Sequence, residues 1–162
     1  MDIVQRISSI QEVQEAIKKA LEVNVYFKRH SIPVICENSA QIDYLIKNAI
    51  GKLGIVCVVQ TPTFDYMGKA EDGHPVWEMP EASIVVSEIP TTNRSRAGAS
   101  TALDAALNAA EAINELGSSV ALEQIYQMEN QGVVSVFVTF KTMCRFCYAK
   151  QTLPPTESGN NS

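Results

Sequence analysis

Apolar residues recur at the three- and four-residue spacing of an α-helix in three parts of the chain. The first part follows a capping-box pattern at Ser9–Glu12, where the serine hydroxyl and the glutamate carboxylate satisfy free amides, and it ends near Val23. The segment Val23–Arg29 fits either an extension of this helix or a short strand. The last helix is predicted at about Ser100–Leu116 and is rich in alanine, which has the highest helix propensity and permits close packing.

A further helix is predicted between these two. Asn38 with Gln41 gives a cap signal, apolar residues follow at helical spacing, and the helix is expected to stop at Gly51 or Gly54. The apolar triplet Val34–Cys36 precedes it and is typical of a short strand, because the proline before the triplet disfavours helix.

Four longer segments have the pattern of strands. Gly54–Gln60 is a continuous apolar run, which is typical of a strand covered on both faces. Ala82–Ile89 is a second strand, which a proline ends. Val133–Thr142 alternates apolar with polar residues, and Val120–Met128 does so imperfectly. The turn signal at Asn130–Gly132 predicts that these two form an antiparallel hairpin.

These elements predict an α+β fold with a mostly antiparallel sheet and about three helices packed on it. The 162 residues fit a single domain, which we assign to residues 1–150. Residues 151–162 are rich in proline and asparagine and are expected to form a flexible tail. The chain has no apolar signal-peptide core and no run of roughly 20 apolar residues. We therefore expect a protein that is made in a cytoplasm and has no membrane partner.

The charge is unevenly distributed along the chain. The formal net charge is −5, which argues against a sequence-specific nucleic-acid partner. Between Ala97 and Phe140 there is no lysine or arginine, and the acidic residues in this span account for the whole net charge. Two interpretations stay open, namely a solvated acidic face and a surface that fits a basic partner.

The segment Thr61–Pro80 is rich in proline and glycine and predicts a long loop or an irregular hairpin. It contains Phe64, Tyr66, Met67 and Trp77, residue types that are enriched where proteins bind proteins. These side chains either contact a partner or fold back onto the core.

Few residues have a pattern that is typical of chemistry. Cys144 and Cys147 form a CxxC pair, which can bind zinc or act as a dithiol, but a structural zinc site requires four ligands. The other two cysteines are single and lie in predicted strands. There is no glycine-rich phosphate loop, no G-x-S-x-G and no H-E-x-x-H. We therefore predict no enzymatic activity, no catalytic residue, no cofactor and no metal.

The stretch Glu88–Arg94 (Glu-Ile-Pro-Thr-Thr-Asn-Arg) and the long helix after it resemble the tail terminator, or tail-completion, proteins of tailed bacteriophages. The resemblance covers residues 2–142. It implies a virion protein that forms a ring, typically of six copies, at the head-proximal end of the tail tube. Such a ring caps the tube and contacts the tail tube protein and the head-neck connector protein. The resemblance also implies a sheet with helices on one side and a loop that projects towards the lumen or an adjacent ring.

A head-to-tail ring requires two different complementary patches on each subunit. We expect Arg94 and Arg96, with Lys18 and Lys19 as weaker candidates, to face an acidic neighbour. Another phage neck or tail adaptor and a CxxC metal or redox module remain as alternatives. The predicted interface residues are Arg94, Arg96, Asp104, Glu111, Glu115, Phe64, Tyr66, Met67 and Trp77.

Overall fold

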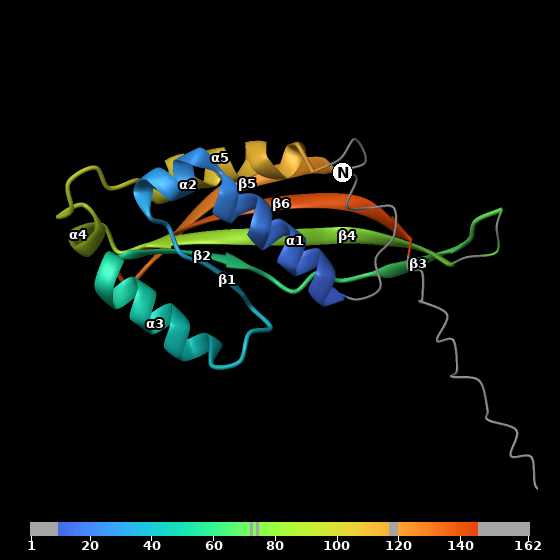
Figure 1. Ribbon diagram of the computed structural model, residues 1–162, viewed down its shortest axis with the longest axis horizontal. Coiled ribbons are helices and arrows are strands. Elements are labelled where there is room, and N and C mark those ends of the chain that lie inside the picture. Colours follow the sequence, from blue (N-terminus) through green and yellow to red (C-terminus); the bar gives the residue numbers. More distant parts are fainter. Residues whose placement is uncertain (1–9, 72, 74, 117–119, 146–162) are drawn as a thin grey trace, which may run out of the picture.

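The computed structural model describes residues 10–71, 73, 75–116 and 120–145. The predicted tail, residues 151–162, lies outside this part. The described residues form helices and one six-stranded sheet (Figure 1). The helices are α1 (Ile10–Val23), α2 (Val25–His30), α3 (Ile42–Leu53), α4 (Pro90–Asn93) and α5 (Ala102–Asn114). The strands are β1 (Val34–Cys36), β2 (Ile55–Val59), β3 (Asp65–Lys69), β4 (Pro75–Glu88), β5 (Ala121–Asn130) and β6 (Val133–Arg145).

The sheet has the strand order β1-β2-β4-β6-β5, and β3 pairs with the first part of β4. Among the strand pairs of the described residues, only β1–β2 is parallel. The long strand β4 therefore pairs with β6 on one side and with β3 and then β2 on the other. The predicted α+β class with a mostly antiparallel sheet is confirmed, and so is the β5–β6 hairpin.

The structure has more helices than the three that the sequence predicts. Five are found within the described residues, of which α2 and α4 are short. The segment that was ambiguous between helix and strand is α2, because the Asn24 side chain accepts hydrogen bonds from the amides of Tyr26 (2.9 Å) and Phe27 (3.3 Å). The cap signal of Asn38 with Gln41 is wrong: α3 begins at Ile42, and the residue before it, Gln41, is in a left-handed conformation and makes no side-chain cap bond.

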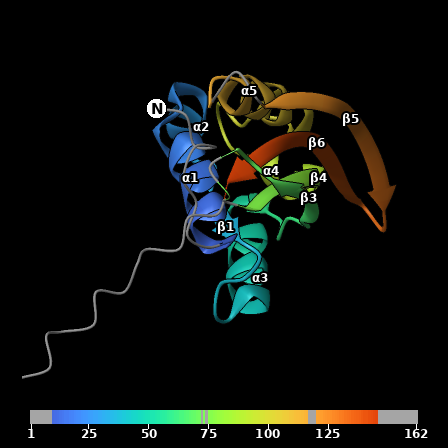
Figure 2. The same ribbon diagram turned by 90° about the vertical axis from the view of Figure 1, so that its right-hand side faces the viewer.

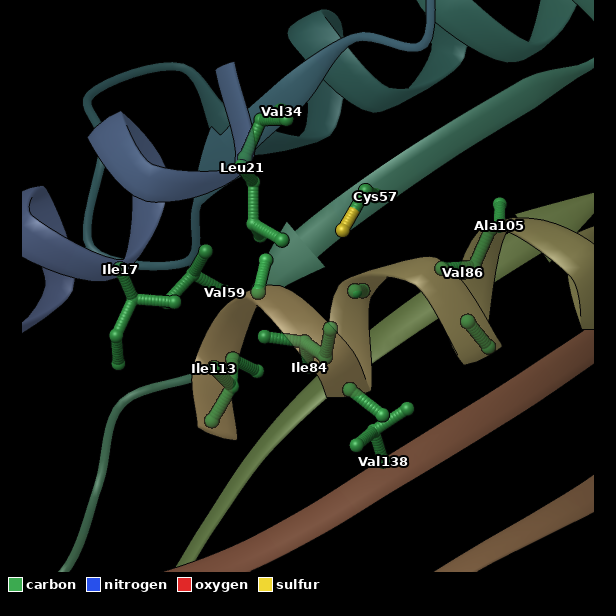
Figure 3. Packing of buried hydrophobic residues seen from close by; sticks show 14 of the residues in the cluster. Ile17, Leu21, Val34, Cys57, Val59, Ile84, Val86, Ala105, Ile113 and Val138 are labelled. Carbon is green, nitrogen blue, oxygen red and sulfur yellow. The ribbon is translucent and has the colours of Figure 1, made fainter. Parts of the chain in front are cut away.

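Helices α1, α2 and α5 cover one face of the sheet, which we call the first face (Figure 2). Alternate residues of β2, β4 and β6 point into this core, where Cys57, Ile84 and Val138 meet Leu21 of α1 and Ile113 of α5 (Figure 3). All five are fully buried. Burial of such side chains stabilises the fold by about 1.5–3 kcal/mol each, which makes this layer the main source of stability.

The alanine-rich face of α5 packs on β4 and β6. Ala105, Ala106 and Ala109 are fully buried, and their single methyl groups let the helix backbone approach the sheet closely. The predicted role of these alanines in close packing is confirmed.

Helix α3 lies on the opposite, second face (Figure 2). Its apolar residues pack on Ile35 of β1 and on Val56 and Val58 of β2. The expectation that the helices lie on one side is therefore wrong. The continuous apolar run of β2 is explained by this arrangement, because the strand is covered on both faces as its sequence predicted.

Candidate functional site

The Glu88–Arg94 turn is held by a buried polar network. The Glu88 side chain is 1% exposed, and its carboxylate accepts hydrogen bonds from Asn93 Nδ2 (3.0 Å), from Arg94 Nε (3.2 Å) and from the Ala102 amide (2.9 Å). Ala102 is the first residue of α5, so the carboxylate also lies at the positive end of that helix. The network ties the end of β4, the α4 turn and the start of α5 together.

The two arginines of the turn already have partners within the chain. Arg94 forms an ion pair with Glu88, while its side chain stays 61% exposed. Arg96 donates from Nη2 to Asn93 Oδ1 at 3.1 Å. The residues that carry the resemblance thus have a role in folding, and their contact with a neighbouring subunit stays a prediction.

Three segments far apart in the sequence bring five basic residues to one end of the molecule, where α2, the end of α3 and α4 lie (Figure 1). His30 Nδ1 donates to the Gly98 carbonyl at 2.6 Å, which joins α2 to the loop after α4. The Ile89 amide donates to the Gly54 carbonyl at 2.8 Å, which joins α3 to the same turn. The residues of this basic end are Lys28, Arg29, Lys52, Arg94 and Arg96.

None of the three segments, 24–31, 49–54 and 89–101, contains an aspartate or a glutamate. Lys28, Arg29, Lys52 and Arg94 are exposed and Arg96 is partly exposed. Sequence reasoning missed the first three as a cluster, because each segment contributes only one or two cations. The weaker candidates, Lys18 and Lys19, lie on α1, where Lys18 pairs with Glu22 at 3.8 Å.

The acidic residues lie on α5 and β5. Asp104, Glu111 and Glu115 are exposed on the outer side of α5, next to Leu103 and Leu107, which are 45% and 49% exposed. On β5, Glu123 pairs with Lys141 of β6 at 3.5 Å and Glu129 is exposed. The acidic residues of this span therefore lie on the outer side of α5 and on the last strand of the sheet.

The second face of the sheet is only partly covered. One row of side chains crosses the four strands β2, β4, β6 and β5 in register, and α3 packs against its first member, Val58. Further along the row, the rings of Phe137 and Tyr126 stack with centroids 4.8 Å apart. A hollow of about 330 Å³ lies between α3 and this row, with Glu37 and Asp43 at its rim. Sequence reasoning missed these residues, although the alternation in β6 places Phe137 on the face opposite the core.

The predicted irregular loop contains the β3–β4 hairpin, which extends beyond the rest of the sheet (Figure 1). Its candidate side chains divide into two groups. Phe64 packs against the core. Tyr66 and Met67 are 54% and 53% exposed, and the Tyr66 ring contacts Trp77 edge-on at 5.5 Å. Phe64 thus folds back onto the core, whereas contact of the exposed Tyr66 and Met67 with a partner stays a prediction.

Two cysteines are free and buried in adjacent strands. Burial raises the pKa of the Cys57 thiol to about 12, with a smaller contribution from Cys36. Burial also raises the pKa of Cys36. Thiolate is the reactive form, so both thiols are expected to be inert. The side chains of Cys144 and Cys147 lie outside the part that the structure describes.

We expect the Cys144→Ser, Cys147→Ser variant to show no fast reaction with a disulfide reagent at pH 8 in the folded state. At that pH only about one Cys57 thiol in 10⁴ is ionised, given its pKa of about 12. Both remaining thiols should react within seconds in 6 M guanidinium chloride, which is the control. Rapid native labelling of either thiol would contradict the packing described above.

The described residues contain no group of three His, Cys, Asp or Glu side chains that could hold a metal ion. None of the helices within the described ranges is long and apolar enough to cross a membrane. No protein-family model matches the chain, and no curated protein matches it.

Proposed function

We propose that this protein is a structural subunit of a bacteriophage tail, which forms a ring that terminates the tail tube and joins it to the head-neck connector. In this proposal the protein acts by binding other copies and other tail proteins through the shape and charge of its surfaces. The proposal combines the resemblance at Glu88–Arg94 with two exposed features of the structure, namely the β5 edge and the side chains of Tyr66 and Met67.

The observation that carries the assembly role is the outer edge of β5, with which no other strand of the described residues pairs. This ten-residue strand pairs with β6 on one side and is the last strand of the sheet. Its residues are mostly exposed, and Gln124–Met128 contains no charge and no proline. Natural proteins usually protect such edges with lysine, proline or a covering segment, because unpaired amides and carbonyls recruit other strands. Of the features that can protect an edge, β5 has a shift in register near its start. It therefore fits a protein that works with another chain beside it.

The hairpin supports the same role. In the proposed ring, the exposed Tyr66 and Met67 of β3 face the tube lumen or an adjacent ring. Aromatic and methionine side chains are enriched at the centres of protein interfaces. The tail tube protein and the connector protein are the proposed partners at the two ends of the ring.

Negative-stain imaging of the purified full chain tests the proposal. We expect annular particles, and a mass several times 17.7 kDa by size exclusion with light scattering. Monomers at tens of micromolar concentration would contradict the ring. Sedimentation with purified tail tubes tests the tail assignment separately, because binding at tube ends is expected only for a tail-completing protein.

We expect Met128→Lys to shift the assembly towards monomer. Met128 is 58% exposed on β5, so a lysine there protects the edge with charge while stability changes by less than about 0.5 kcal/mol. The measurement is light scattering, with urea unfolding as the check on the fold. Tyr44→Lys is the matched control, since Tyr44 is 64% exposed on α3, away from the edge. Equal effects of the two substitutions would count against the edge.

A further inference from the structure

The basic end contains one exposed helix face with an apolar centre. On α2, Val25, Lys28 and Arg29 are related by three- and four-residue spacing, so they lie on the same side of the helix. Val25 is 69% exposed and Val23, just before it, is 56% exposed. Apolar residues with basic neighbours form the kind of surface that binds an acidic, partly apolar patch.

The outer face of α5 is such a patch. Leu103, Leu107 and Glu111 follow one another at four-residue spacing, and Glu115 continues the line. No lysine or arginine occurs between Ala97 and Phe140, so this helix offers carboxylates without a competing cation of its own. The two leucines supply the apolar centre, at 45% and 49% exposure.

We propose that the basic end of one copy of this chain docks against the outer face of α5 of the next copy. This inference rests on the proposed ring and names the surfaces that meet in it. Valines 23 and 25 face Leu103 and Leu107, while Lys28 and Arg29 lie opposite the carboxylates of α5. The two patches differ, so the contact is heterologous, which is the type that closes into a ring.

A second copy fits the basic end better than a nucleic acid does. The chain as a whole has a charge of −5, which repels a phosphate backbone. The same chain carries an acidic side with the apolar residues that match Val23 and Val25. A phosphate backbone offers no apolar partner for these two valines, whereas α5 offers two leucines.

The test uses two charge-reversal variants of the full chain. One is Lys28→Glu, Arg29→Glu, and the other is Glu111→Lys, Glu115→Lys. Each variant alone places like charges across the contact, and we expect the dissociation constant of the assembly to rise at least about tenfold. Mixed one to one, the variants should recover rings, because every contact in an alternating ring then has opposite charges.

The control is Lys47→Glu, Asn48→Asp, which adds negative charge at exposed positions of α3. It should leave the assembly unchanged. If both reversal variants form rings as stable as those of the wild type, this inference is overturned and the ring proposal stays intact. If the wild type is a monomer, the ring proposal itself is overturned. Tight binding of a 20-base-pair DNA duplex by wild type, lost on Lys28→Glu, Arg29→Glu while rings remain, would also overturn the inference.

Discussion

Glu88→Ala is expected to lower the free energy of unfolding by about 2–4 kcal/mol. The substitution leaves the Ala102 amide without its acceptor and removes one of the two acceptors of Asn93 Nδ2. Each buried group without a partner costs about 1–3 kcal/mol, and removal of the side chain also leaves a void. Relief of the cost of burying a carboxylate offsets part of this loss.

Urea unfolding followed by circular dichroism measures the effect. With a typical slope of about 2 kcal/mol per molar urea, the midpoint should fall by about 1–2 M. Arg94→Ala should cost less, about 1 kcal/mol, because the Arg94 side chain is 61% exposed. Glu111→Ala is the control on an exposed carboxylate and should change stability by less than about 0.5 kcal/mol. Equal stability of Glu88→Ala and Glu111→Ala would contradict the network.

This network changes how the resemblance at Glu88–Arg94 can be tested. Reversal of Arg94 and Arg96 places carboxylates next to Glu88 and Asn93, so loss of a ring could follow from damage to the turn. Lys28 and Arg29 have exposed side chains on α2 outside this network, and they separate assembly from folding. The predicted role of the two arginines at an interface is best tested after the stability of each variant is known.

Periodicity in the sequence predicted the elements that depend on local pattern. The spacing of apolar residues located α1, α3 and α5, and alternation located β5 and β6. The continuous run of β2 even indicated cover on both faces. It did not show which helix covers the second face, because α3 has an apolar stripe that would fit either side of the sheet.

The candidate site could be predicted less well from the sequence than the helices and strands, and the reason is physical. The basic end is assembled by tertiary contacts, such as the bond between His30 and the Gly98 carbonyl, and no local pattern reports them. The buried position of Glu88 has the same origin, since its partners come from α4 and α5. The acidic side was predicted because α5 and β5 are consecutive in the chain.

Gly54→Ala is expected to destabilise the protein by about 2–4 kcal/mol. Gly54 ends α3 with φ +72°, where a side chain is strained by about 1 kcal/mol. An added Cβ would also lie 2.8 and 2.9 Å from Cα and Cβ of Asn93, and closer still to its backbone nitrogen. These atoms belong to the α4 turn, which the Glu88 network holds in place, so the turn cannot move aside at low cost.

Gly98→Ala is the matched control for this prediction. Its φ of +70° is nearly the same, but an added Cβ meets nothing within 4 Å, so only the backbone strain of about 1 kcal/mol is expected. The difference between the two midpoints in urea therefore measures the contact between the end of α3 and the α4 turn. Because this contact holds the end of α3 against the α4 turn, and both belong to the basic end, a loss of stability at Gly54 should be accompanied by weaker assembly. Equal effects of the two alanines would mean that the turn yields freely, and the basic end would then not be a preformed surface.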